Sequence, residues 1–347
     1  MVGLLFHLAD QARRQQGLLL HRLGLGPQSR PARTVQTCDA GRLLAYQPAR
    51  RGAPSVLIVP APIKTAYIWD LAPGASVVER CIEAGLQVYL MAWRRPAGAD
   101  AWMGLAEYAD QALAASVEAI GAETGEESVF LAGHSLGGTL AAIFASLHAR
   151  SVRGLIVLEA PMAFGAGTMD MAVARSPHAS TVGAVFGNVP GSFIDCASAA
   201  ADPPTYIAQP PLDWLGSLSS PHAQRLHWQV RRWSLDETPL PRQLYEEVQE
   251  LLYRENRFAK GELDVAGRRA DPRAIDMPIF MVVDARSTVV PPASMEAYRS
   301  GTASPDVQVL DYGGDAGVVL QHVGVLVGPN AHASIWPRVV RWMLAAP

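Results

Sequence analysis

One stretch of this chain restricts its fold more than any other, namely residues 128–138, which read Ser-Val-Phe-Leu-Ala-Gly-His-Ser-Leu-Gly-Gly. The apolar residues at its start predict a buried strand, and the small residues of 139–148 predict a helix. Between them lies a G-x-S-x-G pattern centred on Ser135, which is typical of a nucleophile elbow when a strand precedes it and a helix follows. Gly133 and Gly137 suit a turn that has no room for a Cβ atom. We therefore predict that Ser135 is a nucleophile.

The composition is typical of a compact enzyme. Of the 347 residues, 49% are hydrophobic and 18% are charged, so the chain can bury a large core. The net charge of −3 and the lack of a basic run give no reason to expect nucleic acid as a partner. The three cysteines lie far apart, which predicts no disulfide framework and favours a reducing compartment, the cytoplasm.

The sequence predicts no metal and no cofactor. Its nine histidines show neither H-x-H nor H-E-x-x-H spacing, and its cysteines show no C-x-x-C. The glycine-rich segment 313–317 reads as a turn rather than as a phosphate-binding loop.

The N-terminal residues predict a helix with an apolar stripe, formed by Leu4, Leu5, Leu8 and 18–20. No positive charge precedes this stripe, so we expect no signal peptide. No apolar run approaches the ~18 residues of a membrane span, so we expect no transmembrane segment. The stripe predicts a helix packed on the body or on a partner, with a membrane or granule surface as the alternative.

Strand and helix patterns alternate along both ends of the chain. The predicted strands are 43–46, 55–59, 87–92, the strand that enters the elbow, 154–158, 278–283 and 307–310. The predicted helices are 75–84, 104–124, 139–148 and 336–344. Short apolar strands that alternate with helices predict an α/β fold with a mostly parallel sheet flanked by helices, here the α/β-hydrolase fold.

Residues 163–274 differ from both ends of the chain. They are rich first in Gly, Pro, Ser and Ala and then in Trp and charge, and they carry helical patterns with few strand signals. We predict that they form an inserted, mainly helical cap over the active site. The α/β core is then 36–162 and 275–347, preceded by an N-terminal helical segment, 1–35.

A serine nucleophile needs a base, and in this fold the order along the chain is nucleophile, acid, histidine. His322 follows the last predicted strand and is the expected general base, with His332 as the alternative. Two carboxylates are candidates for the acid: Glu159 at the tip of the strand after the elbow helix, and Asp284 after the next strand. A site without a working acid is the third alternative.

Two backbone N–H groups are expected to stabilise the oxyanion. Leu136, directly after the nucleophile, supplies one. The second belongs to the loop 60–64, where two prolines remove donors, so Ile63 or Ala61 must serve.

Several further segments resemble the polyhydroxyalkanoate synthases, α/β-hydrolase-fold enzymes that polymerise 3-hydroxyacyl-CoA. The resemblance covers most of residues 40–345. It rests on 58–71 (Ile-Val-Pro-Ala-Pro-Ile-Lys-Thr-Ala-Tyr-Ile-Trp-Asp-Leu), 88–96 (Val-Tyr-Leu-Met-Ala-Trp-Arg-Arg-Pro), 233–236 with Leu240 and Pro241, 290–292 and 322–328.

Two departures from the family pattern fall on the chemistry. The resemblance implies a cysteine where Ser135 stands and an aspartate where Ser287 stands, whereas His322 matches the family's histidine. The place of Glu159, at a strand tip, resembles that of the acid in haloalkane dehalogenases, which use an aspartate nucleophile.

These residues favour a serine-dependent ester or thioester hydrolase or acyltransferase that acts on acyl esters or acyl-CoA, with Ser135, His322 and Glu159 as a triad. One alternative is a polyester synthase that uses 3-hydroxyacyl-CoA. Another is a catalytically silent relative that binds acyl chains, polymer granules or a synthase partner. A homodimer, a partner subunit and a polymer-granule surface all stay open.

Overall fold

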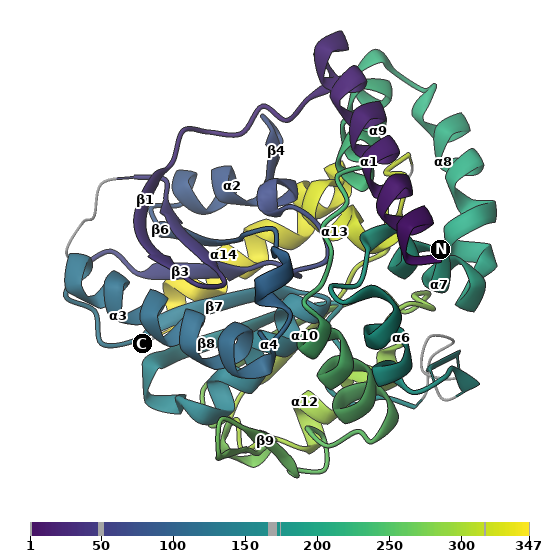
Figure 1. Cartoon of the computed structure of the whole chain (residues 1–347). Coiled ribbons are helices and arrows are strands. Elements are labelled where there is room, and N and C mark those ends of the chain that lie inside the picture. The colour runs from purple at the N-terminus through teal and green to yellow at the C-terminus, as the bar shows by residue number, and fades with distance from the viewer. Residues whose placement is uncertain (1, 48–51, 166–171, 174, 316, 347) are drawn as a thin grey trace.

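An eight-stranded sheet runs through the molecule in the order β1-β2-β6-β3-β7-β8-β11-β12 (Figure 1). This computed structural model describes residues 2–47, 52–165, 172–173, 175–315 and 317–346. The strands of the sheet are β1 (Arg33–Cys38), β2 (Gly41–Ala45), β3 (Ser55–Val59), β6 (Gln87–Trp93), β7 (Val129–His134), β8 (Val152–Leu158), β11 (Ile279–Val283) and β12 (Val307–Asp311).

Strand direction divides the sheet into two parts. β1, β2 and β6 pair antiparallel, whereas β6, β3, β7, β8, β11 and β12 pair parallel. All residues of β3, β7 and β11 are buried, as expected for strands with helices on both faces. The predicted α/β fold with a mostly parallel sheet is therefore confirmed.

Helices cover both faces of the sheet. On one face, α3 (Ala112–Thr124) and α4 (Leu136–Leu147) share a core cluster with the sheet. On the other face, α2 (Val77–Glu83), α13 (Gly324–Val327) and α14 (Trp336–Ala345) share a second cluster. Two separate apolar layers thus hold the strands, and α4 continues directly from the elbow into the first of them.

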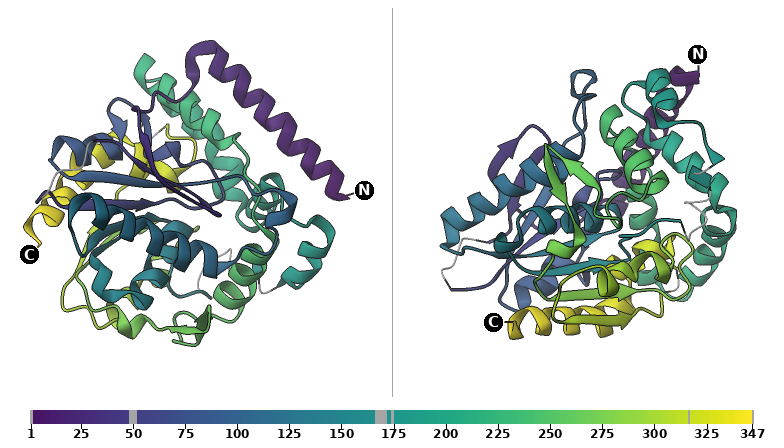
Figure 2. Two further views of the ribbon diagram at one scale, coloured as in Figure 1. Left: turned by 60° about the vertical axis from the view of Figure 1, so that its left-hand side comes forward. Right: turned by 90° about the horizontal axis from the view of Figure 1, so that it is seen from below.

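A group of helices lies beside the sheet and includes most of the predicted cap (Figures 1 and 2). Its members are α6 (Ala179–Phe186), α7 (Gly191–Ala201), α8 (Gln209–Ser217), α9 (Pro221–Ser234) and α10 (Arg242–Glu247). The N-terminal helix α1 (Val2–Leu20) contacts α6, α7 and α9 and runs along their outer side (Figure 2, left). The predicted N-terminal helix is therefore present, and it packs on the cap helices. The prediction that its apolar stripe packs on the body is wrong, because Leu4, Leu5, Leu8, Leu18 and Leu19 are exposed and the helix makes its contacts with another side.

The cap is not cleanly separated from the core. The two-stranded hairpin β9 (Leu263–Val265) and β10 (Arg268–Ala270) packs on α4, and Leu244 and Leu252 belong to the core cluster beneath the sheet. Residues 166–171 and 174 of the predicted cap lie outside the described residues. The proposed limits of the cap, 163–274, stay a prediction.

No helix in the described part of the chain is both long and apolar enough to cross a membrane.

Candidate active site

Ser135 occupies a sharp turn between β7 and α4. Its backbone has φ 54° and ψ −134°, and its N–H donates to the carbonyl O of Leu158 at 3.1 Å. A Cβ atom on Gly137 would lie 2.2 Å from the carbonyl O of Val59, so only glycine fits there. Gly133 is equally crowded, because a Cβ atom on it would lie 2.5 Å from the next turn of backbone. The structure has the strand, turn and helix that the motif predicts.

Glu159 lies at the tip of β8, where its backbone N–H donates to the carbonyl O of Val282 at 2.9 Å. Its side chain is buried, and Oε2 lies 3.2 Å from Nδ1 of His322. Burial raises the pKa of Glu159 to about 8, while His134 acts in the opposite direction. The strand-tip carboxylate and the histidine of the late loop therefore meet, as the sequence predicts.

His322 lies in a helical turn, Gln321–Val323, that leads into α13. Its side chain lines the same cavity as Ser135, and its buried Nε2 has no hydrogen-bond partner among the described residues. Burial lowers the pKa of His322 to about 4, so the ring is neutral near pH 7 and Nε2 is available to accept a proton. The alternative base, His332, is directed at the carbonyl O of Leu326 (2.9 Å), and it is not among the residues that line this cavity.

Several residues of the site have strained backbone conformations. Of the five non-glycine residues with positive φ in the described ranges, three belong to the site: Ser135 (54°), Glu159 (41°) and Val319 (68°). Positive φ costs most for a β-branched residue such as valine, and such outliers cluster at functional sites. The strands and the loop that carry the site hold all three residues in these conformations.

His134, directly before Ser135, makes a contact that its place in the sequence does not predict. Its Nε2 lies 2.7 Å from the backbone O of His322, and the two rings lie 4.4 Å apart at 39°. Burial, together with the nearby His322, lowers the pKa of His134 to about 3, so the neutral ring donates Nε2–H to that carbonyl. His134 thereby positions the loop that carries His322, across 188 residues of sequence.

Asp284, the alternative acid, has another partner. It accepts hydrogen bonds from Nε and Nη2 of Arg286, both at 3.1 Å, and from the Arg286 backbone N–H at 2.9 Å. Among the described contacts it makes none with His322. The hydroxyl of Ser287, in the same loop, acts against the raised pKa of Glu159. The geometry thus brings Glu159, and not Asp284, to the histidine.

The predicted oxyanion donors lie beside the nucleophile. Leu136, Ala61 and Ile63 all line the cavity that contains Ser135. A Cβ atom on Gly137 would lie 2.7 Å from the backbone N of Ala61, so the loop crosses directly over the start of α4. Of the two loop candidates, Ala61 therefore has its amide nearest the elbow. The N-terminal end of α4 adds a positive dipole at the same place.

A cavity of about 880 Å³ opens over Ser135, within the range of small-molecule sites. Most of its wall is apolar, and α1 contributes Phe6, Ala9 and Arg13 to it. Charged side chains also line it, namely Arg13, Lys64, Asp195 and Arg231. Within the described ranges, no group of three or more His, Cys, Asp or Glu side chains could hold a metal ion.

The sheet order, the elbow and the late histidine define the class of the protein. The family model described as "alpha/beta hydrolase fold" matches residues 54–317, and the chain belongs to this family. The predicted fold class is thereby confirmed a second time.

Within that family, the curated relatives of the chain include several polyhydroxyalkanoate polymerase subunits. The poly(3-hydroxyalkanoate) polymerase subunit PhaC of Haloferax mediterranei is 28% identical over 292 residues, which cover 83% of this chain and 58% of the relative. PhaC of Haloarcula marismortui is 26% identical, with 83% and 60% covered, and PhaC of Synechocystis sp. is 27% identical, with 83% and 77% covered. The chain therefore resembles polyhydroxyalkanoate polymerase subunits over most of its length. It spans about three fifths of the two haloarchaeal relatives.

Solved structures agree with the fold. A lipase-like protein from Sulfolobus solfataricus superposes with a TM-score of 0.58 at 16% identity, covering 91% of this chain and 99% of that chain. The DcsB complex with its substrate analogue gives 0.56 at 15% identity, with 92% and 99% covered. At such identities the likeness concerns the fold alone.

Proposed function

We propose that the protein is a serine-dependent acyl-transfer enzyme that acts on acyl or hydroxyacyl esters or thioesters, as a hydrolase or an acyltransferase. One observation carries this proposal. His322 and the elbow serine Ser135 line one apolar cavity, and Oε2 of the buried Glu159 lies 3.2 Å from Nδ1 of His322. The fold family and the polymerase relatives support acyl transfer as the general reaction.

The mechanism follows from the roles that the geometry allows. Ser135 Oγ attacks the acyl carbonyl carbon while His322 Nε2 takes its proton, and Glu159 holds the Nδ1–H of the resulting imidazolium. The oxyanion receives hydrogen bonds from the N–H of Leu136 and from the loop donor, Ala61 or Ile63. The tetrahedral intermediate then collapses and expels the alcohol or thiol of the substrate. This leaving group takes the proton from His322. Water or an alcohol then attacks the acyl-serine carbonyl carbon while His322 takes its proton. The second tetrahedral intermediate releases the acid or the new ester, and Ser135 Oγ, as the leaving group, takes the proton from His322.

The nucleophile favours hydrolysis or transfer to an alcohol over polymerisation through thiols. An acyl-serine is an oxoester, which is more stable than a thioester, so transfer from a thioester to Ser135 is favourable and return to a thiol is not. Transfer to water or to an alcohol meets no such obstacle. The resemblance described above implies a cysteine at this position, and Ser135 therefore predicts a different fate for the acyl group.

Active-site labelling tests the proposal most directly. A fluorophosphonate probe is expected to label the protein at Ser135, and p-nitrophenyl esters of short and medium acyl chains and 3-hydroxybutyryl-CoA are expected to be cleaved. Ser135→Ala should lose both labelling and turnover. Ser300→Ala, at an exposed helix end where Oγ donates to the Glu296 carbonyl O, is the matched control and should keep both. If the wild type neither takes the label nor turns over any ester, the proposal is wrong and a binding-only relative is favoured.

The likeness to poly(3-hydroxyalkanoate) polymerase subunits favours a second candidate, polyester synthesis, for which the family resemblance implies 3-hydroxyacyl-CoA as the substrate. Incubation with 3-hydroxybutyryl-CoA separates the two candidates, because a hydrolase releases the free acid and a synthase accumulates polymer. A Ser135→Cys variant in the same assay asks whether the nucleophile alone decides the product.

A further inference from the structure

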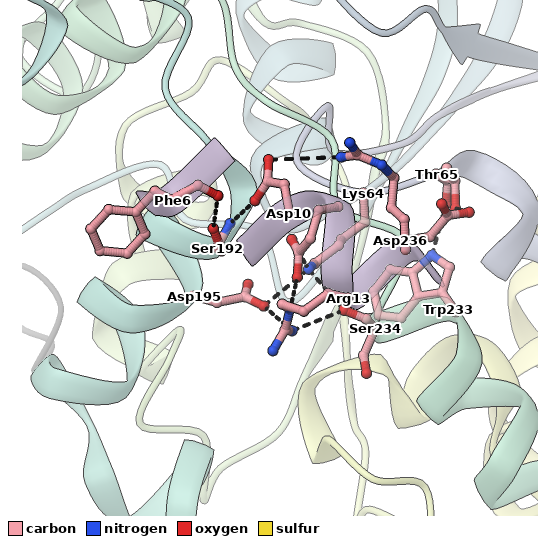
Figure 3. A network of polar contacts seen from close by, with 12 residues as sticks. Phe6, Asp10, Arg13, Lys64, Thr65, Ser192, Asp195, Trp233, Ser234 and Asp236 are labelled. Carbon is pink, nitrogen blue, oxygen red and sulfur yellow. Dashed lines mark hydrogen bonds and ion pairs between the residues drawn. The ribbon is translucent and has the colours of Figure 1, made fainter. Parts of the chain in front are cut away.

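Helix α1 closes one side of the active-site cavity, although it lies outside the segment that matches the family model. Its inner side is tied to the cap by polar contacts (Figure 3). Asp10, which is buried, accepts a hydrogen bond from the Ser192 N–H at 2.8 Å, and the Ser192 hydroxyl donates to the carbonyl O of Phe6 at 3.0 Å. These contacts hold Arg13, one turn further along α1, at the wall of the cavity.

Charged side chains are concentrated around Arg13. Its Nη2 donates to Asp195 Oδ2 at 2.7 Å, and its Nε donates to the buried Glu237. Lys64 Nζ contacts the same two carboxylates, Glu237 Oε2 at 2.6 Å and Asp195 Oδ2 at 3.1 Å (Figure 3). Two cations and two anions therefore balance one another at this end of the cavity.

Arg231 adds a third cation to the same wall, from α9. It is half-buried, and its guanidinium forms no ion pair with any residue that the structure describes. Burial, and then the positive charge of Arg13, lower the pKa of Arg231, while Asp195 and Glu237 act against this shift. A guanidinium keeps its charge at neutral pH, so the cavity wall carries one uncompensated positive charge. Such a charge is costly in a largely apolar cavity unless an anion pairs with it.

We propose that Arg231, together with Arg13 and Lys64, forms a subsite for an anionic group, a carboxylate or a phosphate, on the substrate that Ser135 attacks. The planar guanidinium suits either oxyanion, because both accept two parallel N–H bonds. Lys64 directly follows Ile63 in the oxyanion loop, so the subsite and Ser135 face one cavity and a single substrate can reach both. This subsite rests on the proposed function and names the substrate class that it selects.

Matched substrate pairs test the subsite and separate the two anions. Hexanoyl-CoA is compared with hexanoyl-N-acetylcysteamine, which lacks phosphate, and mono-p-nitrophenyl adipate is compared with its methyl ester, which lacks the free carboxylate. For Arg231→Gln we expect kcat/KM on the anionic member of one pair to fall about tenfold relative to its neutral member, as for the loss of one charge-assisted hydrogen bond. Arg231→Lys should keep part of the preference. The exposed Arg225→Gln, on the same helix, is the matched control and should change neither ratio.

The pair that responds identifies the anion as phosphate or carboxylate. An equal fall on charged and neutral substrates, or no change in either ratio, would overturn the subsite. Calorimetric titration of Ser135→Ala with CoA and with monomethyl adipate tests binding without turnover, and Arg231→Gln should weaken one of the two about tenfold. A wild type that binds one of these anions but cleaves no ester would refute the proposed function and leave the subsite intact.

Discussion

The two walls of the cavity differ in the secondary structure that forms them and in the contacts that hold them together. The wall on the sheet side consists of strand tips and the loops that follow them, and it carries Ser135 and His322. A buried parallel ladder places the strands that lead into Ser135 and Glu159, and Glu159 contacts His322. The wall on the cap side consists of helices α1, α7 and α9, which meet through ion pairs and hydrogen bonds. The first wall carries the proposed chemistry and the second limits what can enter.

The outer surfaces of the two walls differ as well. Helices cover both faces of the sheet, whereas the outer side of the cap exposes many apolar side chains. The exposed apolar residues of α1 include Leu4, Leu5 and Leu8, and those of α8 include Leu212, Trp214 and Leu215. The comparison teaches that the tightly packed sheet can hold residues in strained backbone conformations, whereas the cap wall depends on side-chain contacts between separate helices.

The largest expected effect concerns Glu159, the proposed acid on the sheet side of the cavity. Glu159→Gln keeps the shape of the side chain but cannot hold the imidazolium of His322, so kcat should fall by about 10³- to 10⁴-fold. The matched control is Asp284→Asn, which should lower kcat far less because Asp284 pairs with Arg286. Steady-state kinetics on one p-nitrophenyl ester measure both. Full activity in Glu159→Gln would show that the acid assignment is wrong.

The packing of the elbow is tested by Gly137→Ala. The added Cβ atom would lie 2.2 Å from the Val59 carbonyl O, so the free energy of unfolding should drop by about 3 kcal/mol or more. Gly98→Ala is the control, since nothing lies within 4 Å of its Cβ position, and it should change stability by less than about 0.5 kcal/mol. Urea denaturation followed by circular dichroism measures the difference. Equal stabilities would contradict the close approach of loop and helix.

On the cap side, Glu237 is the residue whose loss should matter most for stability. Glu237→Gln leaves Arg13 and Lys64 with one carboxylate between them, and we expect a loss of about 2 kcal/mol. The control is Glu83→Gln, which breaks only the exposed pair with Arg80 and should cost less than about 0.5 kcal/mol. Hydrogen exchange should show α1 and α7 opening more often in Glu237→Gln while β7 and β8 stay protected. Uniform loss of protection would mean that the two walls unfold as one unit.

A change of pH should also alter stability, through Glu159 and His322 on the sheet side of the cavity. The raised pKa of Glu159, about 8 against a usual 4.5, means that the folded protein holds a proton which the unfolded chain releases. Stability from this group therefore falls as the pH rises from about 4.5 to about 8, by at most about 1.4 kcal/mol per pH unit. Because ionised Glu159 is the form that supports His322, kcat/KM should rise over the same interval.

Comparison of the wild type with Glu159→Gln isolates this contribution from those of other groups. His322, whose pKa burial lowers to about 4, acts in the opposite sense, because its stabilising contribution is lost as the pH falls from 6.5 to about 4. Parallel pH profiles of stability for the two proteins would show that Glu159 is not held protonated by burial.

The sequence signal was strong wherever one local segment decided the structure. β3 occupies its predicted range, 55–59, because five consecutive apolar or small residues are buried on both faces. Ser135 was found because its turn needs glycine on both sides. The prediction of Glu159 over Asp284 needed only the knowledge that a strand tip lies near the late loop, and the structure brings Glu159 to His322.

Features that depend on contacts between residues far apart in the sequence could not be predicted from a local pattern. The polar edge strand β1 (Arg33–Cys38) lacks an apolar pattern, since most of its residues are exposed or partly exposed. His134 reads as the variable position of the G-x-S-x-G motif, although it holds a carbonyl group 188 residues away. The apolar stripe of α1 predicted a packed helix, but the entry of Arg13 into the cavity depends on carboxylates 182 and 224 residues further along the chain.

The long sequence separation between α1 and its partners also affects the order of assembly on the ribosome. Residues 2–20 are made before Ser192, Asp195 and Glu237, which bind them and which follow the first six strands of the sheet along the chain. During that interval Arg13 lacks the two carboxylates that it binds in the folded protein. Helix α1 is therefore made well before the residues that it docks against, and its docking completes the cavity wall.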